Sequence, residues 1–103
     1  MAGEGNIVHV VLTQWRGEIA PEARRELTER ITGFATEIPG IVSVTEGPSV
    51  SPEGLEGEFE WGLVVTFADA AARDVYLDHP AHLPVAKLIG DNAERVVVLD
   101  LAA

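Results

Sequence analysis

Two segments near opposite ends of the chain constrain its fold most, because both are apolar at almost every position. Residues 7–15 read IVHVVLTQW, and residues 95–101 read RVVVLDL. Neighbouring side chains of a strand point to opposite faces of the sheet. Apolar residues at both parities therefore indicate strands that are buried on both faces. Any fold for this chain has to cover these two strands on each side.

The segment after the first strand predicts a helix over residues 21–38. Pro21 suits the first turn of a helix, where its missing N–H is not needed. Apolar residues then recur at spacings of four, three and four, which places them on one face of the helix. These residues are Leu27, Ile31, Phe34 and Ile38. Pro39 and Gly40 end the helix.

The rest of the chain predicts strands, a loop and two helices. Strands are expected over residues 41–47 and 59–67, separated by a loop that is rich in proline and glycine. Asp69 suits the N-cap of a helix that continues to Leu77. Pro80 interrupts this helix and keeps the preceding residue out of it. A short helix over residues 81–89, ended by residues 90–92, precedes the last strand.

This order of elements, β-α-β-β-α-β, predicts a ferredoxin-like α+β fold with a four-stranded antiparallel sheet and two helices on one face. No further element remains to cover the other face. We therefore expect a homodimer in which two sheets pack face to face and close a dimeric α+β barrel, with Trp61 at the interface. Residues 1–6 are expected to form a flexible tail and residues 7–103 a single domain.

The charge of the chain limits its partners. The formal net charge is −10 at pH 7, and such a surface repels phosphate backbones, so no nucleic acid is expected as a partner. No apolar run approaches the roughly 20 residues that span a bilayer, and no signal peptide is visible. We therefore expect a cytoplasmic protein with no membrane partner.

Residues 76–82, which read YLDHPAH, hold the only tyrosine and two of the three histidines. In a catalytic interpretation, neutral His82 removes a proton next to a carbonyl. Tyr76 then donates a hydrogen bond to the oxygen on which negative charge develops. In the alternative interpretation, His79 and His82 hydrogen-bond free backbone groups around the proline. For His79 we favour the alternative, because a residue before proline is well placed to fix a turn.

His9 in the first strand is either a core histidine with satisfied hydrogen bonds or a pocket residue that orients the base or the ligand. With His79, His82 and Asp78 it would offer nitrogen and oxygen ligands to a metal. The proline disfavours a preset pair of histidines, and the chain has no cysteine, so we expect no metal and no cofactor.

The remaining candidate residues also have two interpretations each. Trp15 and Phe34 are candidates for substrate binding in an aromatic pocket, although aromatic residues more often belong to the core. His79 is a third candidate for substrate binding. Asp100, near the end of an apolar strand, is expected at an edge of the sheet or at the rim of the barrel.

Several motifs together resemble a known family. They are HVVLTQW at residues 9–15, IPGI at residues 38–41, TF at residues 66–67, YLDHPAH at residues 76–82 and VVLD at residues 97–100. In this combination, over residues 7–101, the chain is similar to the stress-responsive dimeric α+β barrel (Dabb) family. The resemblance implies the same ferredoxin-like dimer that the order of elements predicts.

The resemblance also implies roles for single residues. One member of the family, a polyketide cyclase, closes a linear chain by an intramolecular aldol reaction without metal or cofactor. Its catalytic tyrosine and histidine match Tyr76 and His82, and a further pocket histidine matches His9. The implied function is a cofactor-independent acid/base enzyme on a hydrophobic carbonyl compound. Two alternatives stay open: a non-catalytic stress-responsive dimer that binds a small molecule or is purely structural, and a relative of cofactor-free monooxygenases.

Overall fold

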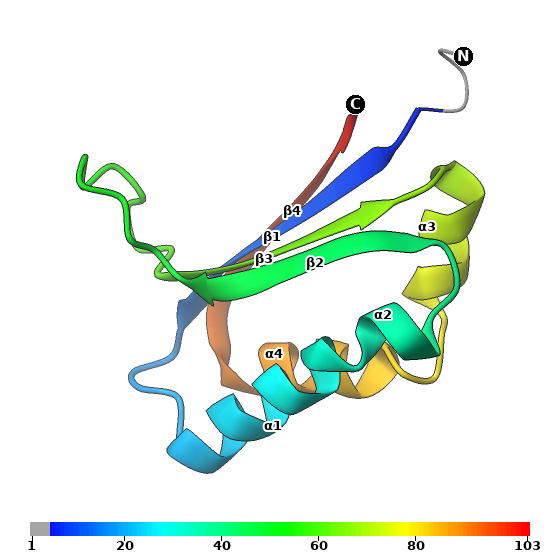
Figure 1. The fold of residues 1–103 in the computed structure, drawn as a ribbon. Helices are drawn as coiled ribbons and strands as arrows, with labels where there is room; N and C mark the ends of the chain where they lie inside the picture. Colours follow the sequence, from blue (N-terminus) through cyan, green and yellow to red (C-terminus); the bar gives the residue numbers. More distant parts are fainter. Residues whose placement is uncertain (1–4) are drawn as a thin grey trace.

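Four strands form one antiparallel sheet in the order β2-β3-β1-β4, and the helices lie on one of its two faces (Figure 1). The computed structural model describes residues 5–103. The strands are β1 (Ile7–Trp15), β2 (Ile41–Pro48), β3 (Trp61–Phe67) and β4 (Ala93–Ala102). The helices are α1 (Pro21–Thr32), α2 (Phe34–Glu37), α3 (Ala70–Leu77) and α4 (Leu83–Asn92). The predicted ferredoxin-like α+β fold is confirmed.

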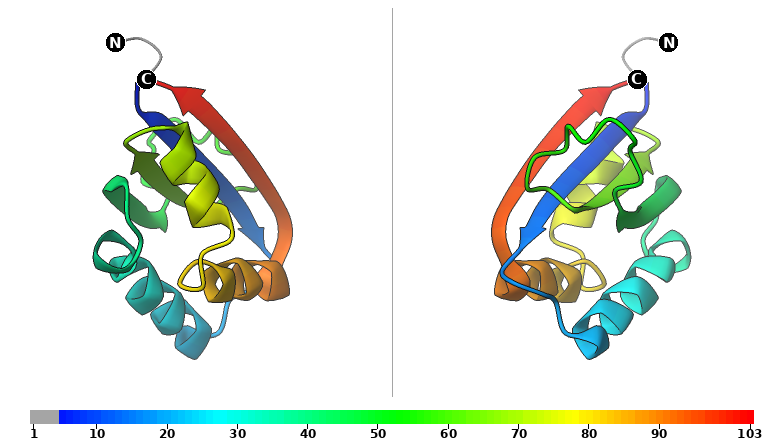
Figure 2. Two further views of the ribbon diagram at one scale, coloured as in Figure 1. Left: turned by 90° about the vertical axis from the view of Figure 1, so that its right-hand side faces the viewer. Right: turned by 90° about the vertical axis from the view of Figure 1, so that its left-hand side faces the viewer.

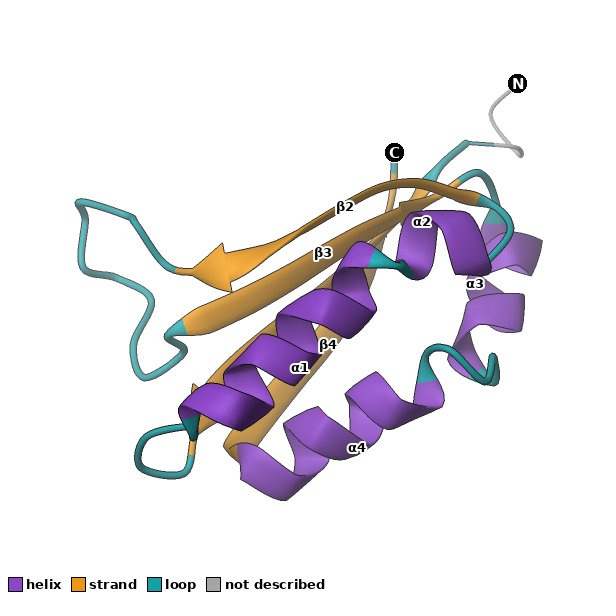
Figure 3. Cartoon of the chain, turned by 60° about the horizontal axis from the view of Figure 1, so that its bottom comes forward, coloured by secondary structure: helices purple, strands orange, loops and turns teal. Residues whose placement is uncertain are grey.

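The core lies between the sheet and the helices, as Figure 3 shows from the helix side. Every second residue of β1 and β3 is buried there, in keeping with the period of a strand. The predicted apolar stripe of the first helical segment packs into the same core. All of its members are buried: Leu27, Ile31, Phe34 and Ile38.

The helix predicted over residues 21–38 is divided at Gly33. The N–H of Gly33 still bonds to the carbonyls of Glu29 and Arg30, and its own carbonyl accepts the N–H of Glu37, the last residue of α2, at 3.0 Å. Glycine is a weak helix former, so the helix is interrupted at the residue with the lowest helix propensity in the interior of this segment. Other boundaries also differ from the prediction: β3 begins at Trp61, α4 begins at Leu83 and continues through residues 90–92, and β4 begins at Ala93.

A glycine turn holds α3 against the sheet. Gly40 has φ +85°, in the left-handed region that favours glycine. A Cβ at this position would also collide with the Cβ of Ala72 in α3. The side chain of Asp69 accepts a hydrogen bond from the N–H of Ala72 at 2.9 Å, which confirms the predicted N-cap. These contacts fix the helix that carries Tyr76.

The other face of the sheet, which we call the open face, carries apolar side chains along β1 and β4. Its residues pair across β1 and β4 as Val8 with Leu101, Val10 with Leu99, and Leu12 with Val97. Those of β1 are half-buried and those of β4 are exposed. Within residues 5–103, no helix or strand covers this face (Figure 1). A contiguous apolar surface of this kind marks an interaction site.

Trp61 does not lie on the open face, so its predicted place at a dimer interface is wrong. It is 2% exposed and packs beneath the helices against Trp15, with 5.4 Å between ring centroids. Its indole N–H donates to Glu46 Oε1 at 2.9 Å. The prediction failed because Glu58 and Glu60 precede β3, so their exposure says nothing about which face Trp61 occupies.

The ends of the described chain lie together. Residues 1–4 of the predicted flexible tail (residues 1–6) are outside the described residues, and the carbonyl of Asn6 accepts the N–H of Ala103 at 2.8 Å. In residues 5–103, no helix has both the length and the apolar character needed to cross a membrane.

Candidate functional site

The corner between α3 and α4 carries two of the three histidines. The ring Nδ1 of His79 accepts the N–H of Ala81 at 3.0 Å, and its carbonyl accepts the N–H of His82 at 2.9 Å. His79 therefore fixes the turn around Pro80, as its favoured interpretation states. The same turn places His82 at the start of α4, facing the sheet.

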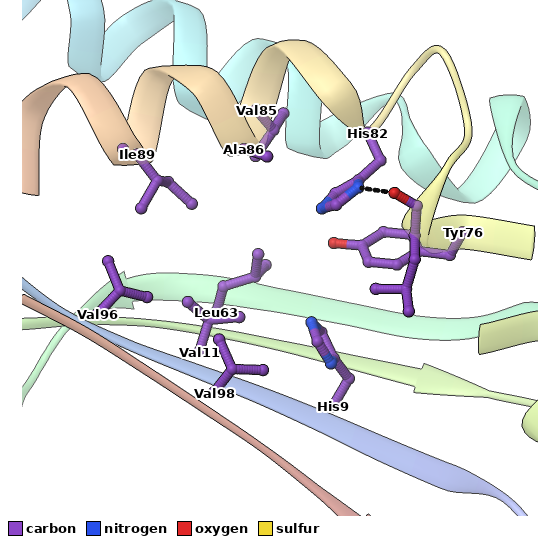
Figure 4. A pocket seen from close by; sticks show the side chains of 12 residues that line it. His9, Val11, Leu63, Tyr76, His82, Val85, Ala86, Ile89, Val96 and Val98 are labelled. Atoms are coloured by element: carbon purple, nitrogen blue, oxygen red, sulfur yellow. Dashed lines mark hydrogen bonds between the residues drawn. The ribbon is translucent and has the colours of Figure 1, made fainter. Parts of the chain in front are cut away.

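A cavity of about 260 Å³ lies between α4 and the helix-covered face of the sheet (Figure 4). Most of its lining is apolar and comes from β1, β3 and β4, from α4 and from the end of α3. The apolar lining residues are Val11, Leu63, Leu77, Val85, Ala86, Ile89, Gly90, Val96 and Val98. Three polar side chains complete the wall: His9, Tyr76 and His82. The three predicted catalytic residues thus meet at one cavity.

Tyr76 brings an unused hydrogen-bond donor to this cavity. Its side chain is 0% exposed, and its hydroxyl has no hydrogen-bond partner within residues 5–103. Figure 4 shows the hydroxyl pointing into the cavity. Burial raises the pKa of the Tyr76 phenol, so it stays protonated at neutral pH. The rings of Phe34 and Phe67, with centroids 5.5 and 4.9 Å away, hold the phenol in place.

His82 stacks beside this phenol, with 4.1 Å between ring centroids. Its Nδ1 lies 3.2 Å from the carbonyl oxygen of Leu77, which ends α3 and has no partner in its own helix. Because a carbonyl can only accept, Nδ1 carries the proton and Nε2 keeps its lone pair. Burial lowers the pKa of His82 more than the bond to Leu77 raises it, so the ring is neutral at pH 7.

His9 is held by a carboxylate. Its Nδ1 donates to Asp100 Oδ1 at 2.7 Å, and Asp100 Oδ2 accepts from Arg73 at 2.6 Å. Burial alone would raise the pKa of Asp100, but the hydrogen bonds from His9 and Arg73 outweigh it and keep that pKa below its usual range. The second ring nitrogen of His9 faces the cavity, and its ring centroid lies 5.5 Å from that of Tyr76 (Figure 4). His9 therefore has a satisfied hydrogen bond and also lines the pocket.

The three predicted substrate-binding residues do not line the cavity. Trp15 packs against Trp61 at the far end of β1. Phe34 is 0% exposed and lies behind the pair of Tyr76 and His82, with its ring centroid 6.4 Å from that of His82. His79 is engaged in the turn described above. Among these three, Phe34 is the one whose ring lies beside the rings of Tyr76 and His82.

Sequence reasoning missed the part of Asp100 and Arg73 in the site. A signal was present: Asp100 is the one acid inside an apolar strand, at the same parity as Val96 and Val98. A carboxylate in such a place needs a partner. The β1–β4 register pairs Asp100 with His9, the only titratable residue of β1, whereas Arg73 could not be assigned without the position of α3.

The geometry gives no support to the metal alternative. Within residues 5–103, no three His, Cys, Asp or Glu side chains come together in a way that could hold a metal ion. The hydrogen-bonded nitrogens of His9, His79 and His82 bind three different groups of the protein.

A family model for the stress-responsive A/B barrel domain (Dabb) matches residues 7–103. The chain belongs to this family. Among curated proteins, the stress-response A/B barrel domain-containing protein HS1 of Arabidopsis thaliana is 27% identical over 97 residues, which are 94% of this chain and 89% of that protein. The resemblance stated from the sequence motifs is thus confirmed.

Solved structures share the A/B barrel fold. A dimeric ferredoxin-like protein of unknown function from Jannaschia sp. CCS1 has a TM-score of 0.87 and 28% identity, over 96% of this chain and 100% of that chain. A hydroxynitrile lyase from Passiflora edulis has a TM-score of 0.84 and 18% identity, over 97% and 94% of the two chains. At that identity the likeness to the lyase shows the fold alone.

Proposed function

We propose that this A/B barrel protein is a cofactor-independent acid/base enzyme that acts on a hydrophobic carbonyl compound, as in the aldol cyclisation of a polyketide-type chain. One observation carries the proposal: the Tyr76 hydroxyl is buried, lacks a partner within residues 5–103 and points into an apolar cavity between two imidazoles (Figure 4). A buried hydroxyl without a partner costs about 1–3 kcal/mol. A ligand oxygen that accepts its hydrogen bond would offset that cost.

His82 is the base in this proposal. The lone pair on Nε2 removes a proton from the carbon next to the carbonyl, and the electrons of the broken C–H bond move onto the carbonyl oxygen as an enolate. In an aldol step the enolate carbon then bonds to a second carbonyl carbon of the same chain. The imidazolium of His82 returns its proton to the alkoxide that forms there. No atom or electron is gained or lost overall.

Tyr76 is the donor in this proposal. Its O–H lies beside the base and would hydrogen-bond the enolate oxygen as negative charge develops. Donors of this type contribute about 3–4 kcal/mol to transition-state stabilisation in a site that excludes water. The raised pKa of the phenol suits this task, since the group has to keep its proton. His9, fixed by Asp100, orients the ligand from the sheet side.

The proposal includes a homodimer. Two copies would pack open face to open face, which would cover the exposed apolar residues of β4 and the half-buried ones of β1. The similar Jannaschia protein is described as dimeric. In such a dimer each cavity stays on the outer, helix-covered side of its own sheet, so the two sites would work separately.

A ketone that exchanges its α-protons with solvent tests the chemistry without knowledge of the natural substrate. We expect the protein to speed deuterium uptake by 2-octanone in D2O, followed by proton NMR. His82→Ala and Tyr76→Phe should each lower the rate by roughly a hundredfold or more. Thr13→Val is the matched control, because Thr13 carries the other buried hydroxyl without a partner among the described residues and does not line the cavity.

Each outcome of this test has a definite meaning. Exchange that His82→Ala leaves unchanged rejects His82 as the base. Exchange lost equally in Thr13→Val points to a general effect on folding and rejects the roles of both site residues. Binding of the ketone without any exchange favours the alternative, a dimer that binds a small hydrophobic molecule and does no chemistry.

A further inference from the structure

We infer that the cavity is a narrow slot for the unbranched apolar tail of an uncharged carbonyl compound, and that Gly90 sets the length of tail that fits. The inference rests on the proposed function for placing the carbonyl group beside Tyr76. It concerns binding only, so turnover is not needed to test it.

The polar and apolar groups of the cavity lie at opposite ends. His9, Tyr76 and His82 are gathered at one end, whereas Ile89 and Val96 lie at the other (Figure 4). A ligand whose carbonyl oxygen bonds to Tyr76 therefore extends the rest of its chain along an apolar passage. The ligand class that matches this arrangement has one polar end and one apolar end.

The length of the passage is similar when it is estimated along α4 and along β4. Along α4, eight residues separate His82 from Gly90, which is about 12 Å at the rise of an α-helix. Along β4, four residues separate Asp100, the partner of His9, from Val96, which is about 14 Å at the rise of a strand. A volume of about 260 Å³ spread over that length accommodates one chain in single file.

The slot meets solvent along one side, between α4 and β4. Ala86 and Gly90 on the helix are exposed, as are Val96 (41%) and Val98 (55%) on the strand. β4 is the edge strand of the sheet, so no further strand shields its outer side (Figure 2). A tail that lies in the slot would remove these exposed apolar side chains from water, which favours binding in proportion to its length.

Gly90 has no role in the backbone that requires glycine. It lies inside α4, and its φ is not positive. A Cβ at this position would meet no packed atom within 4 Å. Glycine weakens a helix relative to alanine, so the residue costs stability without a local reason. It follows His82 and Ala86 at intervals of four, on the helix face that lines the slot, where a missing side chain leaves the far end open.

The lining also selects against charge. It contains no lysine and no arginine. Lys87 on α4 is exposed and paired with Asp91 at 2.8 Å, outside the slot. Because a carboxylate without a partner is costly to bury, a fatty acid should bind more weakly than a ketone of the same length.

The test is a series of 2-alkanones from 2-hexanone to 2-dodecanone, with dissociation constants measured by NMR titration of the protein. We expect affinity to rise about fourfold per methylene and then to level off once the slot is full. In Gly90→Leu the affinity should level off at a shorter ketone, with 2-hexanone bound as before and the longest ketones bound at least roughly tenfold more weakly.

Two controls separate length from helix effects. Lys87→Leu adds the same side chain on the solvent side of α4, and Gly90→Ala changes helix propensity with little added bulk. Both should keep the length dependence of the unmodified protein. An unchanged length dependence in Gly90→Leu overturns the inference, as does affinity that does not grow with chain length, or a carboxylate that binds as tightly as its matched ketone.

The same ketones separate this inference from the proposed enzyme. Ketones that bind with a length limit but exchange no α-protons leave the slot established and overturn the chemistry. Ketones that exchange at the same rate in Gly90→Leu at every chain length establish the chemistry and overturn the slot.

Discussion

Neighbouring residues of β1 lie in opposite environments on the two faces of one sheet. On the covered face, His9 is held at 2.7 Å from Asp100 beneath the helices, beside a phenol that has no partner in the described chain. On the open face, Val8 and Val10 pair with apolar residues of β4 that water reaches. One face thus carries directional polar contacts, and the other carries apolar surface.

The difference shows how one small sheet can serve two purposes. Hydrogen bonds depend on angle and distance, so the polar groups of the covered face need a rigid frame of helices and aromatic rings. Apolar contact has no direction, so the open face needs only shape and area to pack against a second copy. Substitutions on the two faces should therefore affect different properties, assembly for one and chemistry or stability for the other.

The largest expected effect is on the open face. Leu99→Glu would place an unpaired carboxylate in the proposed interface and raise the dimer dissociation constant by roughly a thousandfold. Analytical ultracentrifugation over a range of concentrations measures this. Val75→Glu, on the exposed surface of α3, should leave assembly unchanged. A dimer that tolerates Leu99→Glu would show that the open face is not the interface.

A smaller effect is expected for Asp100 on the covered face. Asp100→Asn removes the charge that both His9 and Arg73 bind, and should lower the free energy of unfolding by about 1–2 kcal/mol. Urea denaturation measures the change. Asp74→Asn is the control, because Asp74 also pairs with Arg73 but lies at the surface and should change stability by less than about 0.5 kcal/mol. Equal effects of the two substitutions would mean that Asp100 stabilises the fold through its bond to Arg73 alone, and not through its bond to His9.

Tyr76→Phe should raise stability while it removes function. The hydroxyl is buried without a partner in the described chain, so its removal should increase the free energy of unfolding by about 1 kcal/mol. Thermal and urea denaturation measure this. A loss of stability would mean that the hydroxyl has a partner within the folded protein, which would weaken its assignment as a free donor.

The smallest effect is a pH dependence from His82. Its pKa is lowered in the folded protein, so the unfolded chain takes up a proton first as the pH falls through about 6.5. The free energy of unfolding should therefore be constant above that pH and decrease below it. Urea denaturation at pH 7.5 and 5.5 should show a larger decrease for the unmodified protein than for His82→Gln. Asp100 contributes only at lower pH, because its pKa lies below the usual carboxyl range.

The sequence predicted the fold well because each element has a local signal. The pattern of apolar residues predicts the strand over residues 7–15 and the buried helix stripe from Leu27 to Ile38. The side chain of Asp69 predicts the helix cap. The break at Gly33 was missed because the apolar stripe continues through it. Trp61 was misplaced because the exposed glutamates before it lie outside the strand.

The site was predicted only in part. His9, Tyr76 and His82 were expected at one pocket and do line one cavity, but this followed from motifs and resemblance. The pairing of His9 with Asp100 depends on the register of two strands at opposite ends of the chain. Trp15 lies away from the cavity because β1 extends past the end of the cavity. No spacing within the sequence shows where the cavity ends along this strand.

The sequence by itself determined the order of elements, the two strands with apolar side chains on both faces, and the scarcity of groups that titrate near neutral pH. These features depend on composition and on residues close together in the chain. Only the tertiary structure decided which nitrogen of each histidine is free, that the Tyr76 hydroxyl is left without a partner among the described residues, and that Gly90 borders a slot. These depend on groups far apart in sequence, whose distances are fixed only when the helices pack on the sheet.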